Sequence, residues 1–238
     1  MSMALTLDRQ NAYRDRYRAL NPGWRPATEV YESLIRAHLA PGMRVLDIGC
    51  GRGGVLEQLR EAVSRPVGLD PDPVSLREHR IPGLPRAAAL AAALPLRAES
   101  VDLALASWVF EHLADPGRVF AELRRVLRPD GRAIFLAPNA VSLVALLNRA
   151  LRPLQRHLVP RLYGRAEADT FPVYYRANTR RQIRRWADAA GLRCERLILV
   201  EDPTYLAFSP LLFRANIALA RVTPPVHLIG ILAKASSS

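Results

Sequence analysis

The chain contains almost no lysine, few cysteines and no long apolar run. Lys234 is the only lysine among 34 basic residues, so arginine supplies nearly all of the formal net charge of +12. The two cysteines, Cys50 and Cys194, are too few for a disulfide framework. No apolar run reaches the roughly 18 residues of a membrane span, and charged residues interrupt the N-terminal region where a signal peptide would lie. We therefore expect a cytoplasmic protein.

Metal-ligand spacing is also missing. The five histidines are scattered along the chain, and none stands beside a cluster of carboxylates. Aromatic residues make up 7% of the chain, and they interleave only thinly with the arginines, unlike the pattern of a single-strand nucleic-acid channel. The sequence therefore predicts no metal site and disfavours nucleic acid as a partner.

The positive charge is concentrated in one region. Residues 149–196 hold twelve arginines and four acidic residues, a local net charge of +8. We interpret Arg180, Arg181, Arg184 and Arg185 as a solvated helix face. For the remaining arginines, an anionic small substrate or peripheral contact with an anionic membrane stays open.

Residues 45–54 carry the most informative pattern of the chain. The apolar run 45–48 is typical of a buried strand, and Gly49, Gly51 and Gly54 then predict a tight turn. Apolar residues at helical spacing follow the turn: Val55, Leu56, Leu59 and Val63. Strand, glycine turn and helix open a doubly wound α/β domain, in which a nucleotide-like ligand lies over the carboxyl end of the strand.

The glycines alone leave the nucleotide open. Their spacing fits the dinucleotide pattern, and Asp70 lies at a suitable distance to accept hydrogen bonds from a ribose. Asp47, however, stands two residues before Gly49, where its carboxylate would repel a pyrophosphate. S-adenosylmethionine has no phosphate and carries an ammonium and a sulfonium. With Asp47, the segment resembles motif I of the class I S-adenosylmethionine-dependent methyltransferases.

Two further segments resemble the type-11 subgroup of this family. They are LPLRAESVDLALASWVFEHL at residues 94–113 and PGRVFAELRRVLRPDGRAIFLAPN at residues 116–139. The resemblance covers roughly residues 30 to 140, and it implies a Rossmann-like, doubly wound sheet of seven strands whose last strand is antiparallel. It also implies a division of the chain into an N-terminal flap (1–29), a cofactor-binding core (30–139), a substrate-lid insertion between strands five and six (140–178), the rest of the core (179–234) and a tail (235–238).

The resemblance implies a set of cofactor-binding residues. Asp70 would accept the ribose hydroxyls, and the others would surround the nucleoside and the methionyl group. The set comprises Asp47, Gly49, Cys50, Gly51, Asp70, Pro71, Leu90, Ala91, Ser107 and Trp108. One position departs from the family, which usually has an acid four residues before the Leu-Pro pair, where this chain has Leu90. We therefore expect apolar contact from Leu90, and the N–H of Ala91, to hold the adenine.

Candidate residues for the acceptor lie elsewhere. His112 follows the fourth strand and is the candidate general base, with a structural tie to neighbouring loops as the alternative. Residues of the lid insertion that would contact the acceptor are Arg161, Tyr163, Arg165, Tyr174, Tyr175 and Arg176. A lid held by local salt bridges is the alternative for these.

These patterns together predict a methyltransferase of small molecules, with oxygen as the acceptor atom. Residues 106–109 lack the Asn/Asp-Pro-Pro-aromatic motif of amino-methylating nucleic-acid enzymes. The alternatives are C-methylation of a quinone-like or polyketide-like ring, a lipid- or glycan-directed enzyme that docks at a membrane, and a cofactor-binding protein without catalysis.

Overall fold

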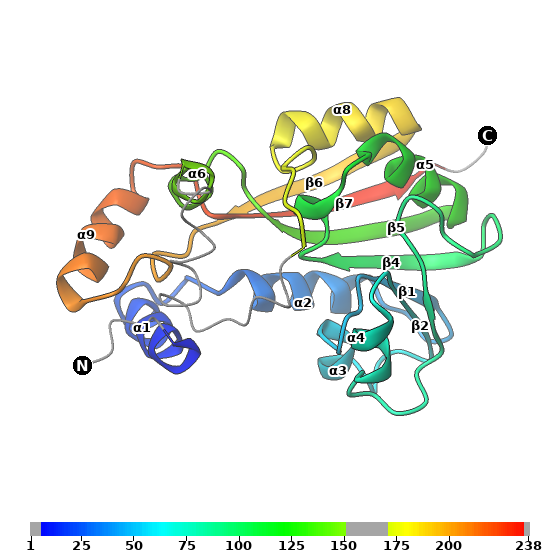
Figure 1. The fold of residues 1–238 in the computed structure, drawn as a ribbon, viewed down its shortest axis with the longest axis horizontal. Helices are drawn as coiled ribbons and strands as arrows, with labels where there is room; N and C mark the ends of the chain where they lie inside the picture. The colour runs from blue at the N-terminus through cyan, green and yellow to red at the C-terminus, as the bar shows by residue number, and fades with distance from the viewer. Residues whose placement is uncertain (1–5, 151–170, 236–238) are drawn as a thin grey trace.

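The computed structural model describes residues 6–150 and 171–235 of the 238-residue chain. Within these ranges, seven strands form one mixed sheet in the order β3-β2-β1-β4-β5-β7-β6 (Figure 1). The strands are β1 (Arg44–Ile48), β2 (Arg65–Asp70), β3 (Arg86–Ala88), β4 (Val101–Ser107), β5 (Leu127–Pro138), β6 (Leu192–Val200) and β7 (His227–Lys234). β1 to β5 pair in parallel, and β7 is antiparallel to both β5 and β6. The predicted seven-stranded sheet with an antiparallel last strand is therefore confirmed.

The strand directions bring distant parts of the chain to one end of the sheet. Ile48 pairs with Leu69 of β2 and with Ala106 of β4, so the residues that follow these strands lie together. β7 runs the other way, and its first residue, His227, pairs with Pro138 at the carboxyl end of β5. The carboxyl end of the sheet thus collects the residues after β1, β2, β4 and β5 together with the start of β7.

Helices cover both faces of the sheet, because successive apolar side chains of a strand point to opposite faces and both faces must be buried. In β4, Leu103 and Leu105 pack on the side of α2 (Ala27–His38) and α3 (Val55–Gln58). Ala104 and Ala106 pack on the opposite side, which α5 (Pro116–Val126) and α8 (Arg180–Ala190) cover. Two shorter elements complete this part: α4 (Pro73–Arg77) and the 3-10 helix η1 (Phe110–His112).

Local sequence signals set the ends of α8 as expected. The Thr179 side chain accepts a hydrogen bond from the Gln182 N–H, and Gly191 ends the helix with φ of +70°. The apolar spacing predicted a helix that continues to Val63, but α3 ends at Gln58. Leu59 and Val63 are nevertheless buried in the same cluster. The apolar spacing therefore predicted correctly that these residues are buried, but not that they belong to one continuous helix.

Three helices gather at the carboxyl end of the sheet: α1 (Leu7–Leu20), α6 (Leu143–Ala150) and α9 (Pro210–Ala220) (Figure 1). α1 packs on α9 through Tyr13 and Phe213, whose ring centroids are 4.6 Å apart. The N-terminal segment is also tied to the residues after β6, since Trp24 Nε1 donates to the Glu201 carbonyl over 2.9 Å. In the described part of the chain, no helix is long and apolar enough to cross a membrane.

Candidate cofactor and acceptor site

The glycine turn joins β1 to its neighbours on both sides. The N–H groups of Gly49 and Cys50 both donate to the Leu69 carbonyl at the end of β2, over 2.7 and 3.1 Å. On the other side, a Cβ atom added to Gly49 would lie 2.4 Å from Val109 Cγ2. Gly49 and Gly51 also have φ of +74° and +50°, a region that side-chain-bearing residues rarely adopt. Close approach and backbone conformation therefore both require glycine at Gly49.

Cys50 has a packing role in this turn. Its side chain is buried, and burial raises the pKa of its thiol to about 12. A Cβ atom on Gly68 of β2 would lie 2.8 Å from Cys50 Sγ, so the sulfur fills the space that this glycine leaves. A thiol held in this way is a poor nucleophile, because the thiolate is the reactive form.

Asp70 is fixed by two backbone donors. Gly51 N–H donates to its Oδ2 over 2.9 Å, and Asp72 N–H donates to its Oδ1 over 2.8 Å. Each carboxylate oxygen accepts more than one hydrogen bond, so both keep capacity for further donors such as ribose hydroxyls. Pro71 follows directly and leads into α4. The geometry supports the ribose contact that the sequence predicted for Asp70.

Asp47 lies beside Asp70 at the same end of the sheet, and we call these two residues the carboxylate pair. Only 4% of the Asp47 surface is exposed. Burial, with a further contribution from the Asp70 charge, raises the pKa of Asp47 to about 7. No ion pair with a cationic side chain reaches either residue in the described part of the chain. This end of the sheet thus holds more negative charge than its surroundings compensate.

The carboxylate pair and the short helix after the turn both disfavour a pyrophosphate. An anion bound at a helix N-terminus depends on aligned peptide dipoles and free N–H groups. α3 has only 4 residues, and its first residues follow the glycine turn beside two carboxylates. A cationic ligand lowers the electrostatic cost of the pair, whereas an anionic one increases it.

The loop after β3 carries the two residues that the sequence predicts to hold the adenine. Ala89 N–H donates to the Asp70 carbonyl over 3.1 Å, which holds this loop against the end of β2. Leu90 follows with 63% of its surface exposed. The Ala91 N–H has no hydrogen bond to the described residues. Both groups are therefore available for a ligand, and their contact with the adenine stays a prediction.

The exit of β4 carries a strained residue. Trp108 follows Ser107 with φ of +59°, uncommon for a bulky side chain, and its N–H donates to the Leu136 carbonyl over 2.8 Å. Its indole ring lies edge-on to the His227 ring, with the centroids 5.3 Å apart. The backbone conformation therefore directs Trp108 across the carboxyl end of the sheet toward β7.

His227 was not a candidate from the sequence. It is buried, and burial lowers its pKa to about 4, so the ring is neutral at physiological pH. Its Nε2 lies 3.1 Å from the Tyr205 hydroxyl, while its buried Nδ1 has no hydrogen-bond partner among the described residues. We call Trp108, Tyr205 and His227 the aromatic–histidine group. The available signal was a polar residue opening an otherwise apolar strand after Pro224-Pro225.

His112 contacts the segment that returns from residue 171. Its Nδ1 lies 2.9 Å from the Pro172 carbonyl, and its Nε2 lies 4.0 Å from Glu111 Oε1. Because a carbonyl only accepts, Nδ1 must carry the proton, which leaves Nε2 with a free electron pair in the neutral ring. Burial raises the pKa of Glu111 to about 7, and within residues 6–150 and 171–235 its buried Oε2 has no hydrogen-bond partner. The arrangement is compatible with both roles predicted for His112, as a general base and as a structural link to neighbouring loops.

The predicted lid residues divide into two groups. Arg161, Tyr163 and Arg165 lie outside the described residues. Tyr174 and Tyr175 donate from their backbone N–H groups to the Glu111 carbonyl, over 2.7 and 3.3 Å.

Arg176 continues the same attachment. Its Nη1 donates to the Ala114 carbonyl over 2.5 Å, and its guanidinium lies over the Tyr174 ring, 5.4 Å from the centroid. Residues 171–176 are therefore held against η1 and the loop after it. The contacts given for these three residues involve the protein itself, and their role toward an acceptor stays a prediction.

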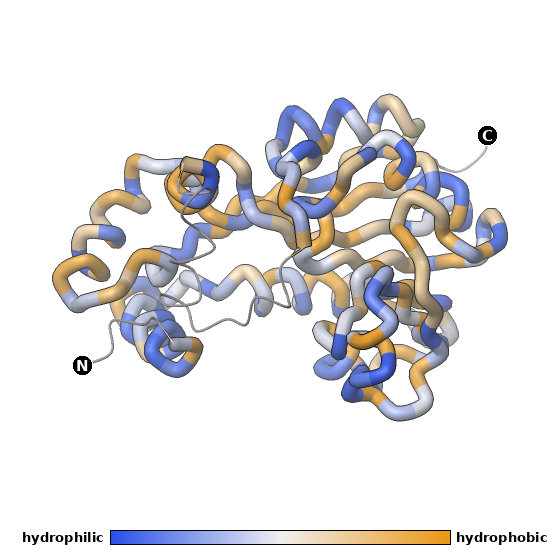
Figure 2. Tube along the Cα trace, in the orientation of Figure 1, coloured by the Kyte–Doolittle hydropathy of each residue, from blue (hydrophilic) through white to orange (hydrophobic). Residues whose placement is uncertain are grey.

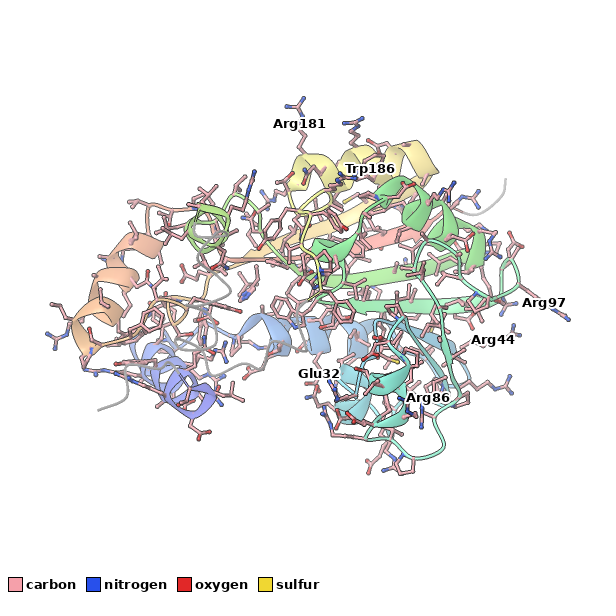
Figure 3. The ribbon with its side chains drawn as sticks, viewed as in Figure 1. Glu32, Arg44, Arg86, Arg97, Arg181 and Trp186 are labelled. Carbon is pink, nitrogen blue, oxygen red and sulfur yellow. The ribbon has the colours of Figure 1, made fainter. Side chains whose placement is uncertain are left out.

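The arginines of α8 lie apart from the site. Figure 3 shows Arg181 extending from α8 away from the sheet. Arg185 lies over the Trp186 ring, 5.1 Å from the centroid, and Trp186 Nε1 donates to the Arg176 carbonyl. This geometry agrees with a solvated basic helix face.

A glycine turn and an acid at the carboxyl ends of β1 and β2 define the Rossmann-like class of nucleoside-binding folds. Residues 46–135 match the family model described as a methyltransferase domain. This segment, which runs from β1 to β5, is similar to that family.

Two curated relatives cover part of the chain. A protein of Mycolicibacterium smegmatis, named as a probable S-adenosylmethionine-dependent methyltransferase, is 35% identical over 115 residues, 48% of this chain and 44% of that protein. A ubiquinone biosynthesis O-methyltransferase of Hahella chejuensis is 32% identical over 106 residues, 42% of this chain and 44% of that protein. The chain spans less than half the length of the curated relatives it matches, with 37%, 39% and 44% for the first three.

Solved structures extend the likeness of the fold. The geranyl diphosphate C-methyltransferase of Streptomyces coelicolor, in complex with S-adenosyl-L-homocysteine, has a TM-score of 0.59 and 16% sequence identity. The match covers 87% of this chain and 77% of that one. The protein therefore has the Rossmann-like fold of these methyltransferases across most of its length.

Proposed function

We propose that this protein is an S-adenosylmethionine-dependent methyltransferase acting on a small molecule. The observation that carries the proposal is the carboxylate pair: two buried acids beside a glycine turn, without a cationic partner in the described ranges. The ammonium and sulfonium of S-adenosylmethionine relieve this negative charge, whereas a dinucleotide adds to it. The match of residues 46–135 to the methyltransferase-domain family supports the same ligand.

Each part of the cofactor has its own expected contact. Asp70 accepts the ribose hydroxyls, since both of its oxygens keep acceptor capacity beside the Gly51 and Asp72 donors. Asp47 stabilises the cationic methionyl end. Leu90 packs on the adenine and Ala91 N–H donates to it, in place of the usual acid. An apolar contact gives less hydrogen-bond specificity than an acid, so we expect weak discrimination of changes to the adenine amino group.

The chain's task in the reaction is to hold the acceptor and take up its proton. S-adenosylmethionine, when bound, supplies an electrophilic methyl group, and positioning of the acceptor accounts for much of the acceleration. Trp108 follows β4, contacts the His227 ring of β7 and is 36% exposed, which suits the wall of an acceptor site. We propose His112 as the base, because the Pro172 carbonyl fixes the tautomer in which Nε2 accepts a proton.

We propose an oxygen acceptor, as in the O-methyltransferase relative. A C-methyltransferase also has this fold, so methylation of a quinone-like or polyketide-like ring is the second candidate. A lipid or glycan acceptor and a protein that binds the cofactor without catalysis remain further candidates. The last is favoured by the absence of the adenine-binding acid at Leu90.

The ligand is tested by calorimetry on the full chain with S-adenosylmethionine, S-adenosylhomocysteine and oxidised nicotinamide dinucleotide. We expect the first two to bind and the dinucleotide not to. Asp70→Asn keeps the side-chain volume but removes the charge and one acceptor, so we expect affinity to fall by about a hundredfold.

Glu32→Gln is the matched control, because Glu32 lies on α2 and pairs there with Arg36 (Figure 3). Thermal unfolding verifies that each variant folds. Unchanged affinity in Asp70→Asn, or preferential binding of the dinucleotide, would contradict the proposal. Once an acceptor is found by methyl transfer to hydroxylated rings, His112→Ala should lower kcat and leave cofactor affinity unchanged.

A further inference from the structure

The side of α9 that faces away from the protein is apolar. Leu211 is 77% exposed and Val222, just after the helix, is 80% exposed. Ala215, Ala218 and Leu219 are exposed between them. These five positions follow one another at steps of one, three or four residues, so they form one stripe along the helix. We call this stripe, with Leu212 at its margin, the α9 apolar face.

The opposite side of α9 is also apolar and fixes the orientation of the helix. Phe213 is buried against Tyr13 of α1, and Ile217 packs on the same cluster. Asn216 Nδ2 donates to the Pro203 carbonyl over 2.7 Å. A helix that is apolar all round is normally covered on all sides. Figure 2 accordingly shows orange and pale colours over much of α9, although one side faces outward.

Charge identifies what covers this face. Arg214 and Arg221 are seven residues apart, so they lie along the same margin of the stripe, and both are exposed. Residues 203–226 contain no acidic side chain. Two copies of the chain meeting through this face would bring arginines together without a carboxylate to pair with them. A surface with an apolar interior and anionic groups at its boundary complements the face instead.

The neighbouring helix α6 is also apolar and basic, without acidic residues. A cavity between α6 and α9 is lined by Leu143 and Val144 from α6 and by Asn216 and Ala220 from α9, so the two helices are neighbours. α6 carries Arg149 in its last turn and, like α9, has no acidic residue. α6 follows β5 and α9 follows β6, and both helices lie toward the carboxyl end of the sheet (Figure 1).

We propose that the α9 apolar face docks on the surface of an anionic lipid bilayer. The exposed leucines and Val222 enter the boundary between head groups and acyl chains, while Arg214 and Arg221 contact anionic head groups. The helix is too short to span a bilayer, so it lies in the plane of the surface. The inference does not depend on the proposed methyl transfer.

Flotation of the full chain with vesicles tests the docking. We expect binding to vesicles of phosphatidylcholine mixed with phosphatidylglycerol, and weaker binding to phosphatidylcholine alone. The double variant Leu211→Ser and Val222→Ser should lower partitioning by at least about tenfold, because it removes the two most exposed apolar groups. Arg214→Gln with Arg221→Gln should remove the difference between the two vesicle types.

Leu20→Ser is the matched control, since Leu20 is an equally apolar, 62% exposed residue on α1. It should bind vesicles like the wild type. All substitutions are at exposed positions, and circular dichroism with thermal unfolding verifies the fold. Failure of the wild type to float, or unchanged flotation of the Leu211 and Val222 variant, would overturn the proposal. So would a dimer in sedimentation velocity that this variant dissociates, which would assign the face to a second copy.

Discussion

The carboxyl end of the sheet has two halves that differ in their buried titratable groups. In the half formed by β1 and β2, Asp47 and Asp70 lie together as acids without a cationic partner in the described ranges. In the half formed by β4 and β7, His227 is buried as a neutral base between Trp108 and Tyr205. The first half attracts a cation, and the second offers a neutral, aromatic surface.

This difference suits the two reactants of the proposed reaction. A cofactor with positive charge binds where negative charge is in excess, and a neutral planar acceptor binds where aromatic rings are exposed without charge. The halves meet where β1 pairs with β4. The carboxylate pair and the aromatic–histidine group nevertheless belong to different elements, so side-chain substitutions can address each half separately.

Gly49→Ala should disable the half that carries the carboxylate pair. The added Cβ would lie 2.4 Å from Val109 Cγ2 at φ of +74°, so the turn must move. We expect a loss of stability of about 2–4 kcal/mol and no measurable cofactor binding. Gly54→Ala is the matched control, because a Cβ there meets nothing within 4 Å. Chemical denaturation and calorimetry measure both variants, and equal effects in the two would refute the role of the turn.

His227→Asn should remove a pH dependence from the other half. The pKa of His227 falls to about 4 on folding, mainly through burial, with Asp202 raising it and Arg14 lowering it. Between that value and the unfolded pKa near 6.5 the unfolded state binds more protons, so stability falls as the pH falls. We expect the wild type to lose about 3 kcal/mol across this window relative to the variant. Parallel curves in urea denaturation from pH 4 to 6.5 would contradict this.

Asp47 should make cofactor affinity depend on pH. Its folded pKa is about 7, so below this pH a cationic ligand must displace a proton from the carboxyl group. We expect affinity to rise by up to about tenfold per pH unit as the pH approaches 7, and to level off above it. The ligand's amino group also titrates, so the comparison with Asp47→Asn isolates the protein's part. Calorimetry at several pH values would refute the idea if both proteins gave the same profile.

The half with the carboxylate pair was predictable from the sequence, for a physical reason. A buried parallel strand is a short apolar run, and the turn after it demands glycine, so both leave a local trace at residues 45–54. Asp70 could be located because it ends the next such strand. The ends of α8 were predictable for the same reason, since Thr179 and Gly191 act within one turn of the helix.

The half with the aromatic–histidine group has no comparable local pattern in the sequence. Trp108, Tyr205 and His227 are far apart in the chain, and only the antiparallel return of β7 brings them together. The orientation of α9 was equally hidden, because a helix with apolar residues on two opposite sides gives no signal of which side faces the core. Its packing through Phe213 on Tyr13 made that choice.

Local patterns in the sequence were enough to locate the buried strands, the glycine turn and the carboxylate pair, because each depends on a few adjacent residues. Only the tertiary structure decided that Asp47 has no cationic neighbour in the described ranges, that His227 is buried beside Tyr205, and that Leu211 faces outward. Burial and charge compensation depend on neighbours from other elements. The pairing of β7 with β5 and the packing of α1 on α9 supply those neighbours.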